Sequence, residues 1–176
     1  PHAQVPILSP PLLAVVWRPL AMLGDPAMVA WGLAGVIALG TATLVMIARG
    51  GFRRLAIIAP IGLFIAESMW SGNVNPFIVL LVIGVWVASA RGHSATAGAL
   101  VALAAGLKLT PIYLAWWFVV RGDWRAIGGL LAAGAVLGVV SLLGAGLDNH
   151  LAFLKVAGVT AVDGASPWSV AGFIRN

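Results

Sequence analysis

Lys108 is the side chain whose surroundings point most directly to binding chemistry. It stands in Gly106-Leu107-Lys108-Leu109-Thr110-Pro111, where a charge and a proline interrupt two apolar stretches. An ammonium group at such a helix break is well placed to hold a phosphate. Alternatively, the lysine chain follows the apolar surface and places its charge in water. The residues by themselves leave these two interpretations even.

Two amides and one acid are further candidates. Asn73 and Asn75 lie in a polar turn before Pro76, where amides can bond sugar hydroxyls or cap the next helix. For the pair, capping of the next helix is the favoured interpretation, with Asn75 as a plausible cap. Glu67 is the only acid inside an expected apolar span, and burying a carboxylate in lipid is costly enough to indicate function. The alternative is that Glu67 lies close to the interface, where it reaches water or a basic partner.

The histidines complete the candidate set. His2, His93 and His150 are far apart in sequence and share no helix face, so no metal site is expected. The sequence also has no cysteine, no glycine-rich phosphate loop and no nucleophile elbow. No metal or cofactor is therefore expected. The expected substrate-binding residues are Lys108, Asn73, Asn75, Glu67 and His150, and no catalytic residue is assigned.

The composition excludes most soluble classes of protein. Hydrophobic residues make up 61% of the chain and charged residues 9%, in long uncharged runs that suit a bilayer. The formal net charge of +5 comes from basic residues spread between these runs. Because they form no patch and do not alternate with aromatic residues, nucleic-acid binding is excluded.

The apolar runs predict an all-α, polytopic helical membrane protein with about four full spans and a hairpin of two short helices. The hairpin is expected because residues 94–120 are too long for one straight span and are interrupted at Lys108 and Pro111. Arg49-Gly50-Gly51 is expected to end the first span, and Gly134 with Gly138 to allow close helix packing in the last. The full spans are expected at residues 27–48, 55–70, 74–90 and 126–147, and the short helices at 94–107 and 111–120.

The whole chain, residues 1–176, is expected to be a single transmembrane domain and part of a longer protein. Residues 1–26 read as an interfacial or half-helix segment, because the stretch 10–20 is short and rich in proline. Residues 27–147 hold the membrane spans. Residues 148–176 are expected to form a non-cytoplasmic loop and the start of the next helix.

The basic residues favour the hairpin over a single long span. With a hairpin, six arginines share the cytoplasmic side, and only Lys108 and Lys155 fall on the other. The arginines are Arg49, Arg53, Arg54, Arg91, Arg121 and Arg125. The non-cytoplasmic surface then receives Glu67, Asn73, Asn75, Lys108, Asp148, His150 and Asp163.

Several short motifs follow one another along the chain: Pro10-Pro11-Leu12 with Arg18-Pro19-Leu20, Gly72-Asn73-Val74-Asn75, the Lys108 segment with Pro111, Arg121-Gly122-Asp123-Trp124-Arg125, and the segment from Ser166 to Gly172. In this order they resemble the motifs of glycosyltransferase family 87, a family of the GT-C membrane glycosyltransferases. Asn73 stands where the family usually has glutamine. The resemblance covers nearly the whole chain.

The resemblance implies a GT-C-like fold and a mannosyltransferase-like activity. A sugar, commonly mannose, would pass from a polyprenyl-phosphate donor to a lipid or glycan acceptor on the non-cytoplasmic side. The catalytic acid of such enzymes lies in a first extracytoplasmic loop, expected upstream of this chain. The expected partners are membrane lipid and the lipid-linked donor, and the expected location is the bacterial inner membrane. The alternative is a non-catalytic membrane subunit or a small transporter.

Overall fold

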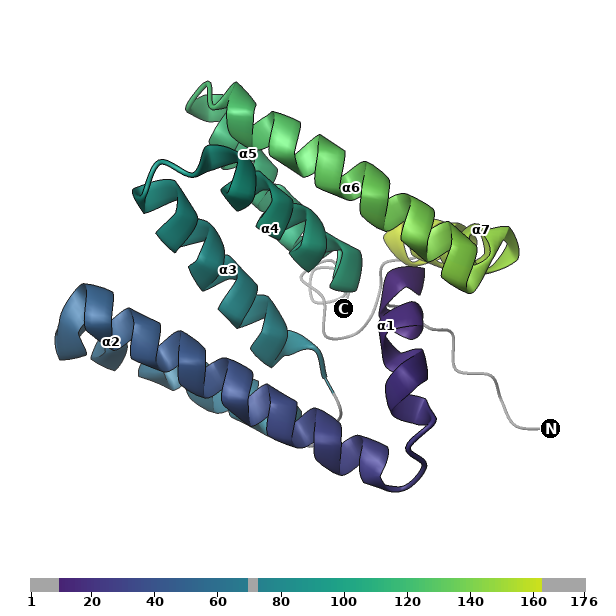
Figure 1. The fold of residues 1–176 in the computed structure, drawn as a ribbon, viewed down its shortest axis with the longest axis horizontal. Coiled ribbons are helices and arrows are strands. Elements are labelled where there is room, and N and C mark those ends of the chain that lie inside the picture. Colours follow the sequence, from purple (N-terminus) through teal and green to yellow (C-terminus); the bar gives the residue numbers. More distant parts are fainter. Residues whose placement is uncertain (1–9, 70–72, 163–176) are drawn as a thin grey trace, which may run out of the picture.

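The computed structural model describes the backbone of residues 10–69 and 73–162, and the side chains of residues 10–50 and 73–155. Every regular element in this described backbone is helical, as the sequence predicts (Figure 1). In chain order the elements are α1 (Pro11–Ala21), α2 (Pro26–Met69), α3 (Asn75–Ala90), α4 (Ser94–Leu107), the 3-10 helix η1 (Thr110–Tyr113), α5 (Leu114–Val120), α6 (Trp124–Ala145) and α7 (Leu147–Val162).

The first helices confirm one boundary and correct another. α1 is the expected half-helix, with 11 residues and a proline in its first turn. α2 begins at Pro26 as predicted, but its helical backbone does not end at Arg49-Gly50-Gly51 and continues to Met69, while the segment that is apolar and long enough to cross a membrane is Pro26–Gly50. Glycine lowers helix propensity by about 1 kcal/mol yet keeps its backbone N–H, so it weakens a helix without ending it. Figure 1 shows α2 bending so that its second part runs behind its first.

The prediction of about four full spans is wrong for the described residues. Two segments there are long and apolar enough to cross a membrane, Pro26–Gly50 with 25 residues and Trp124–Ala145 with 22. α3 has 16 residues and α4 has 14. At about 1.5 Å per residue, both are shorter than a hydrocarbon core of roughly 30 Å. The expected span 55–70 lies where no side chains are described.

The two long segments differ from the core helices of soluble proteins. Only 22% and 11% of their most apolar windows are buried within the structure. Large apolar side chains therefore cover the outside, and Leu143 of α6 is 84% exposed. Such an apolar outer surface fits a lipid environment better than water.

The short-helix hairpin is confirmed. α4 has the predicted bounds, and the chain leaves it through Lys108, whose backbone is extended at φ −150° and ψ 128°. The second arm begins as η1 rather than as the α-helix expected at 111, and continues as α5. Phe118 of α5 is fully buried in a cluster with Ala97 and Val101 of α4, so the second arm folds back on the first.

Glycine lets α4 and α6 approach closely, although not at the predicted positions. A Cβ added to Gly98 of α4 would collide with the Ala126 carbonyl of α6, and one added to Gly129 of α6 would collide with Ala95. At Gly134 and Gly138, in contrast, an added Cβ would meet no atom within 4 Å. The prediction that these two glycines form the helix contact is therefore wrong.

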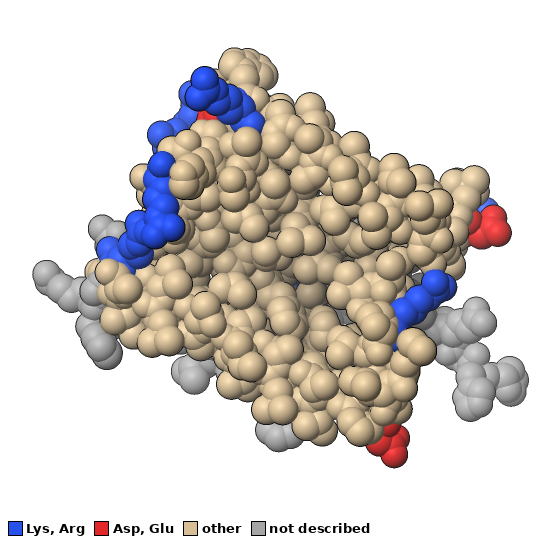
Figure 2. Space-filling view, viewed as in Figure 1, with Lys and Arg blue, Asp and Glu red and all other residues tan. Residues whose placement is uncertain are grey.

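Charge is divided between the two ends of the helices. Figure 2 shows Lys and Arg side chains gathered where α3 ends and α6 begins, and a wide uncharged band beside them. Arg91 follows α3 and Arg121 follows α5, which places the α3–α4 and α5–α6 turns at one end. This is the grouping of arginines that the hairpin predicts for the part of the chain with described side chains. Which side of a membrane it faces stays a prediction.

Candidate functional site

A hydrophobic cluster places the two polar segments beside each other. Trp31 of α2, Val74 before α3 and Leu107 at the end of α4 are buried together, at 7%, 6% and 9% exposure. Val74 directly precedes Asn75, and Leu107 directly precedes Lys108. Burial of the two apolar residues therefore brings the two polar side chains to one rim of the cluster.

Aromatic rings from three helices pack together in this cluster. The Trp31 ring lies 4.8 Å from the ring of Trp17 in α1 and 4.5 Å from the ring of Phe77 in α3, measured between centroids. Such pairs add about 0.5–1.5 kcal/mol beyond the area they bury. The contacts pack α1, α2 and α3 against one another in this cluster.

Lys108, Asn75 and Asn73 form one polar group across this rim. The Lys108 Nζ donates to Asn75 Oδ1 over 2.8 Å. The backbone N–H of Asn75 donates to Asn73 Oδ1 over 3.2 Å. The structure thus unites three of the five residues that the sequence predicts for substrate binding.

The bonding of Asn75 corrects one prediction. Val74 occupies the cap position of α3, no side chain caps the helix there, and Asn75 is the first helical residue. The interpretation of Asn75 as a helix cap is therefore wrong. Its side chain serves Lys108 instead, while Asn73 satisfies the Asn75 N–H that the helix leaves without an internal partner.

The chemistry of this group suits an anion. The Asn75 amide is neutral, so it orients the Lys108 ammonium without cancelling its charge. An ammonium group has three N–H donors, and the bond to Asn75 uses one. Lys108 is half-buried, which strengthens its attraction for a phosphate relative to a fully exposed lysine.

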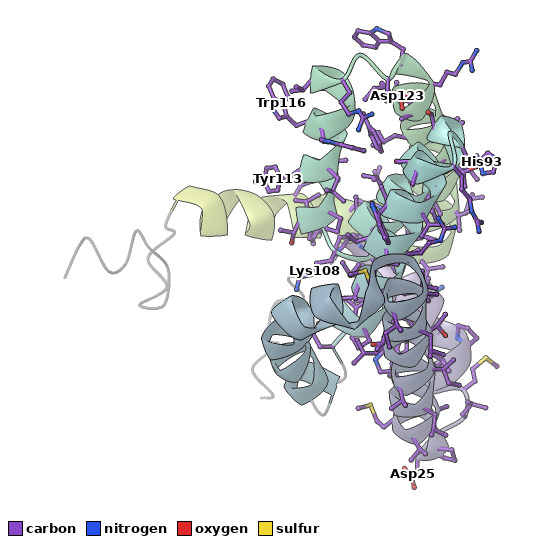
Figure 3. The ribbon with its side chains drawn as sticks, turned by 90° about the vertical axis from the view of Figure 1, so that its left-hand side faces the viewer. Asp25, His93, Lys108, Tyr113, Trp116 and Asp123 are labelled. Carbon is purple, nitrogen blue, oxygen red and sulfur yellow. The ribbon has the colours of Figure 1, made fainter. Side chains whose placement is uncertain are left out.

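Two exposed aromatic residues lie on the same side of the molecule as Lys108 (Figure 3). Tyr113 of η1 is 78% exposed and Trp116 of α5 is 69% exposed. His93 lies on the opposite side. Tyr and Trp are frequent at membrane interfaces because their rings are apolar and their tips are polar. The side of the molecule that carries Lys108 therefore also carries aromatic residues suited to a membrane interface.

His150 belongs to a second polar group. Its Nδ1 lies 2.8 Å from the Gly146 carbonyl, and its Nε2 lies 2.9 Å from the Ser141 hydroxyl. A carbonyl only accepts, so Nδ1 carries a proton, and in the neutral imidazole Nε2 then accepts the hydroxyl hydrogen of Ser141. Ser141 is buried at 5% exposure within α6. These bonds join the end of α6 to the start of α7.

Ser141 and His150 border an apolar pocket. The pocket has a cavity volume of about 360 Å³ and lies between α1, α4, α6 and α7, with Ile112 of η1 at one side. Small residues of α4 and α6 form much of its wall: Ala102, Ala105, Gly106, Gly134 and Gly138. This pocket is distinct from the Lys108 group, because Lys108 and Asn75 do not line it.

The remaining sequence candidates fall elsewhere. The side chain of Glu67 and the whole of Asp163 lie outside the described residues. Asp148 is exposed in the first turn of α7. Ser141 carries no sequence signal, because a lone serine in a glycine-rich apolar run is common in packed helices. Among the side chains that the structure describes, no group of three or more His, Cys, Asp or Glu residues could hold a metal ion.

Within the described residues, fold and site together define an all-helical protein with an apolar outer surface and a lysine that is paired with an asparagine at a helix break. Residues 8–174 match the family model of glycosyltransferase family 87, and the chain belongs to that family. Searches of curated proteins and of solved structures found no match. Family membership implies a glycosyltransferase, and the two long apolar helices fit a membrane-associated one. It favours this class over a non-catalytic subunit or a transporter.

Proposed function

We propose that this chain binds a polyprenyl-phosphate sugar, with mannose as the expected sugar, in a GT-C-type hexosyltransferase. The sugar is transferred to a lipid or glycan acceptor on the non-cytoplasmic side of a bacterial inner membrane. The observation that carries the proposal is the bond of 2.8 Å between Lys108 Nζ and Asn75 Oδ1, which holds a half-buried cation at a helix break. Family membership supplies the reaction class.

The proposed role of Lys108 follows from where charge develops in the reaction. The bond between the anomeric carbon and the phosphate oxygen breaks, and the leaving phosphate keeps the electron pair. The acceptor hydroxyl forms the new bond to the anomeric carbon and passes its proton to a general base. A cation fixed at the phosphate binds the charged donor in the ground state and also meets the negative charge that grows on the leaving oxygen, so its loss weakens donor binding.

Asn75 and Asn73 act in this proposal by positioning Lys108. Asn75 sets the direction of the ammonium group, and Asn73 holds the backbone of Asn75. A preorganised cation is more effective than a mobile one, because no reorganisation is needed during the reaction. Glu67 and His150 stay proposed contacts for the sugar or the acceptor. No residue of this chain is assigned as the general base.

The membrane orientation is part of the same proposal. Arg91 and Arg121 stand at the end of the helices opposite to the Lys108 turn, because α4 runs from the first end to the second. Basic residues concentrate on cytoplasmic faces. The Lys108 site is accordingly proposed to face the non-cytoplasmic side.

The test is sugar transfer by the whole protein in liposomes, with polyprenyl-phosphate mannose varied as the donor. A charge-assisted contact to phosphate contributes about 1.5–3 kcal/mol, so Lys108→Ala should raise the donor KM roughly tenfold to a hundredfold. Lys108→Arg should restore the activity only in part, since a planar guanidinium differs from an ammonium.

Lys155→Ala is the matched control, because Lys155 is an exposed lysine of α7. It should leave the donor KM unchanged. All variants are compared at equal amounts of folded protein. An unaltered donor KM in Lys108→Ala would reduce Lys108 to a lysine that merely reaches the interface, and the donor-binding proposal would fall.

A further inference from the structure

We infer that the apolar pocket between α1, α4, α6 and α7 holds a hydrocarbon chain of the acceptor, which makes the acceptor a lipid. The inference rests on the proposed function and narrows its acceptor from lipid or glycan to lipid. The pocket volume of about 360 Å³ is within the range of small-molecule sites, which is about 300–1,000 Å³.

The wall of the pocket matches an alkyl chain. None of the side chains that line it is charged. The pocket is open along the surface of α6, because a Cβ added to Gly134 or Gly138 would meet no atom within 4 Å. An alkyl chain in this space would be removed from water or lipid headgroups and would contact apolar atoms on several sides.

One side of the pocket is polar and lies close to a cation. Ser141 and His150 border the cavity and bond to each other. One helical turn beyond Ser141, the Gly144 carbonyl accepts a hydrogen bond of 2.6 Å from Arg18 Nη1 of α1. Arg18 is exposed and has five N–H donors, so it can also meet an anionic headgroup. Uncharged walls beside a cation complement a lipid that has an apolar chain and a phosphate headgroup.

The pocket also connects with the apolar outside of the protein. Leu154 of α7 lines the pocket and is 63% exposed. An amphiphile can therefore enter sideways from a bilayer. A soluble glycan would find few hydrogen-bond partners there, because only two of the side chains that line the pocket, Ser141 and His150, are polar.

The turn after α4 separates this pocket from the proposed donor site. Gly106 and Ile112 line the pocket, whereas Lys108 between them bonds to Asn75 of α3. Leu107 is buried on the α3 side, in the cluster with Val74. A donor phosphate at Lys108 thus begins its chain on the α3 side of the turn. Two lipids can bind on the two sides of one turn, as transfer between lipid-linked molecules requires.

The direct test uses a phospholipid with a diazirine in one acyl chain, added to liposomes that contain the whole protein. After irradiation, mass spectrometry should find cross-links on α6 and α7 at the pocket wall, including Leu137 and Phe153. Cross-linking needs no sugar transfer. If the protein is cross-linked at the pocket but transfers no sugar, the pocket is a lipid site and the proposed function fails. If it transfers sugar but is not cross-linked at the pocket, the proposed function stands and the inference about the pocket fails.

Filling the pocket provides the variant test. Gly138→Leu should lower the cross-linking yield on the order of tenfold, because its side chain displaces several methylene groups of the lipid. Gly138→Ala should have a smaller effect. Gly128→Leu is the matched control, since Gly128 is on the same helix, has open space at its Cβ and does not line the pocket.

The kinetic outcome separates the two lipid substrates. Gly138→Leu should raise the KM for a lipid acceptor and leave the donor KM unchanged. A raised donor KM with an unchanged acceptor KM would assign the pocket to the polyprenyl chain and overturn the inference. Equal cross-linking in Gly138→Leu and Gly128→Leu would also overturn it, because the pocket would then hold no lipid chain.

Discussion

Lys108 Nζ donates to Asn75 Oδ1 over 2.8 Å, and this bond ties the end of α4 to the start of α3. The residues are 33 positions apart, so the bond depends on how the two helices pack. Asn75→Ala should raise the donor KM about tenfold, because Lys108 loses the partner that orients it. Donor titrations of sugar transfer measure this effect.

A double-mutant cycle shows whether the two residues act as one unit. The combined Lys108→Ala and Asn75→Ala variant should be little worse than Lys108→Ala alone, since the role of Asn75 is exerted through Lys108. Asn149→Ala is a suitable control, because this exposed amide makes a local bond, to the Ala145 carbonyl. Fully additive effects of the two substitutions on the donor KM would show that Asn75 acts independently of Lys108.

The hairpin makes a prediction about membrane topology. The chain has no cysteine, so single cysteines can be introduced at the exposed positions His93 and Trp124. The neighbouring Gly92 and Gly122 are less suitable, because their φ angles of 76° and 65° strain any other residue. Both cysteines should react with an impermeant thiol reagent from the cytoplasmic side only.

A third position reports on the other side of the membrane. Leu147 is 63% exposed at the start of α7, after the long helix α6. A cysteine there should react only from the side opposite to positions 93 and 124. If positions 93 and 124 label from opposite sides, residues 94–120 cross the membrane once and Lys108 is no longer at the proposed surface.

The hairpin was predictable because its signals are local. Pro111 has no backbone N–H to continue the hydrogen bonds of α4, and the chain leaves the helix just before it, at the charged Lys108. The end of α4 follows from these two residues. Glycine is a weaker signal, since Gly50 and Gly51 cost helix stability without removing a hydrogen bond, and α2 continues through them.

The Lys108 site was only partly predictable, because its contacts are long-range. The sequence identifies the lysine and both asparagines as candidates, but the pairing of Lys108 with Asn75 depends on burial of Val74 and Leu107 in one cluster. Likewise, glycine spacing along α6 does not tell which face meets another helix. Gly129 packs against Ala95 of α4, whereas Gly138 lines the pocket.

The close contact between α4 and α6 predicts that alanine substitution destabilises the fold at a glycine in the contact but not at a glycine in open space. Gly98→Ala would place a Cβ against the backbone of Ala126, which cannot move as a side chain can. The variant should therefore lose about 1–3 kcal/mol of folding stability. Gly128→Ala, with open space at its Cβ, should be neutral or gain up to about 1 kcal/mol through helix propensity.

Both glycine variants can be compared by unfolding in mixed micelles with increasing SDS. The midpoint should shift to lower SDS for Gly98→Ala and stay near the wild-type value for Gly128→Ala. Similar midpoints for the two variants would mean that α4 and α6 do not pack as closely as the structure has them.

The bond between Ser141 and His150 predicts an asymmetry in stability. His150→Ala leaves the buried Ser141 hydroxyl without its partner, which costs about 1–3 kcal/mol. Ser141→Ala costs less, because the half-buried imidazole can turn its Nε2 to water. The double variant should be no less stable than His150→Ala, because without the Ser141 hydroxyl no buried polar group is left unpaired. Thermal unfolding of the three variants in detergent gives this order. A Ser141→Ala variant as unstable as His150→Ala would show that the hydroxyl is satisfied in another way, for example by a carbonyl of its own helix.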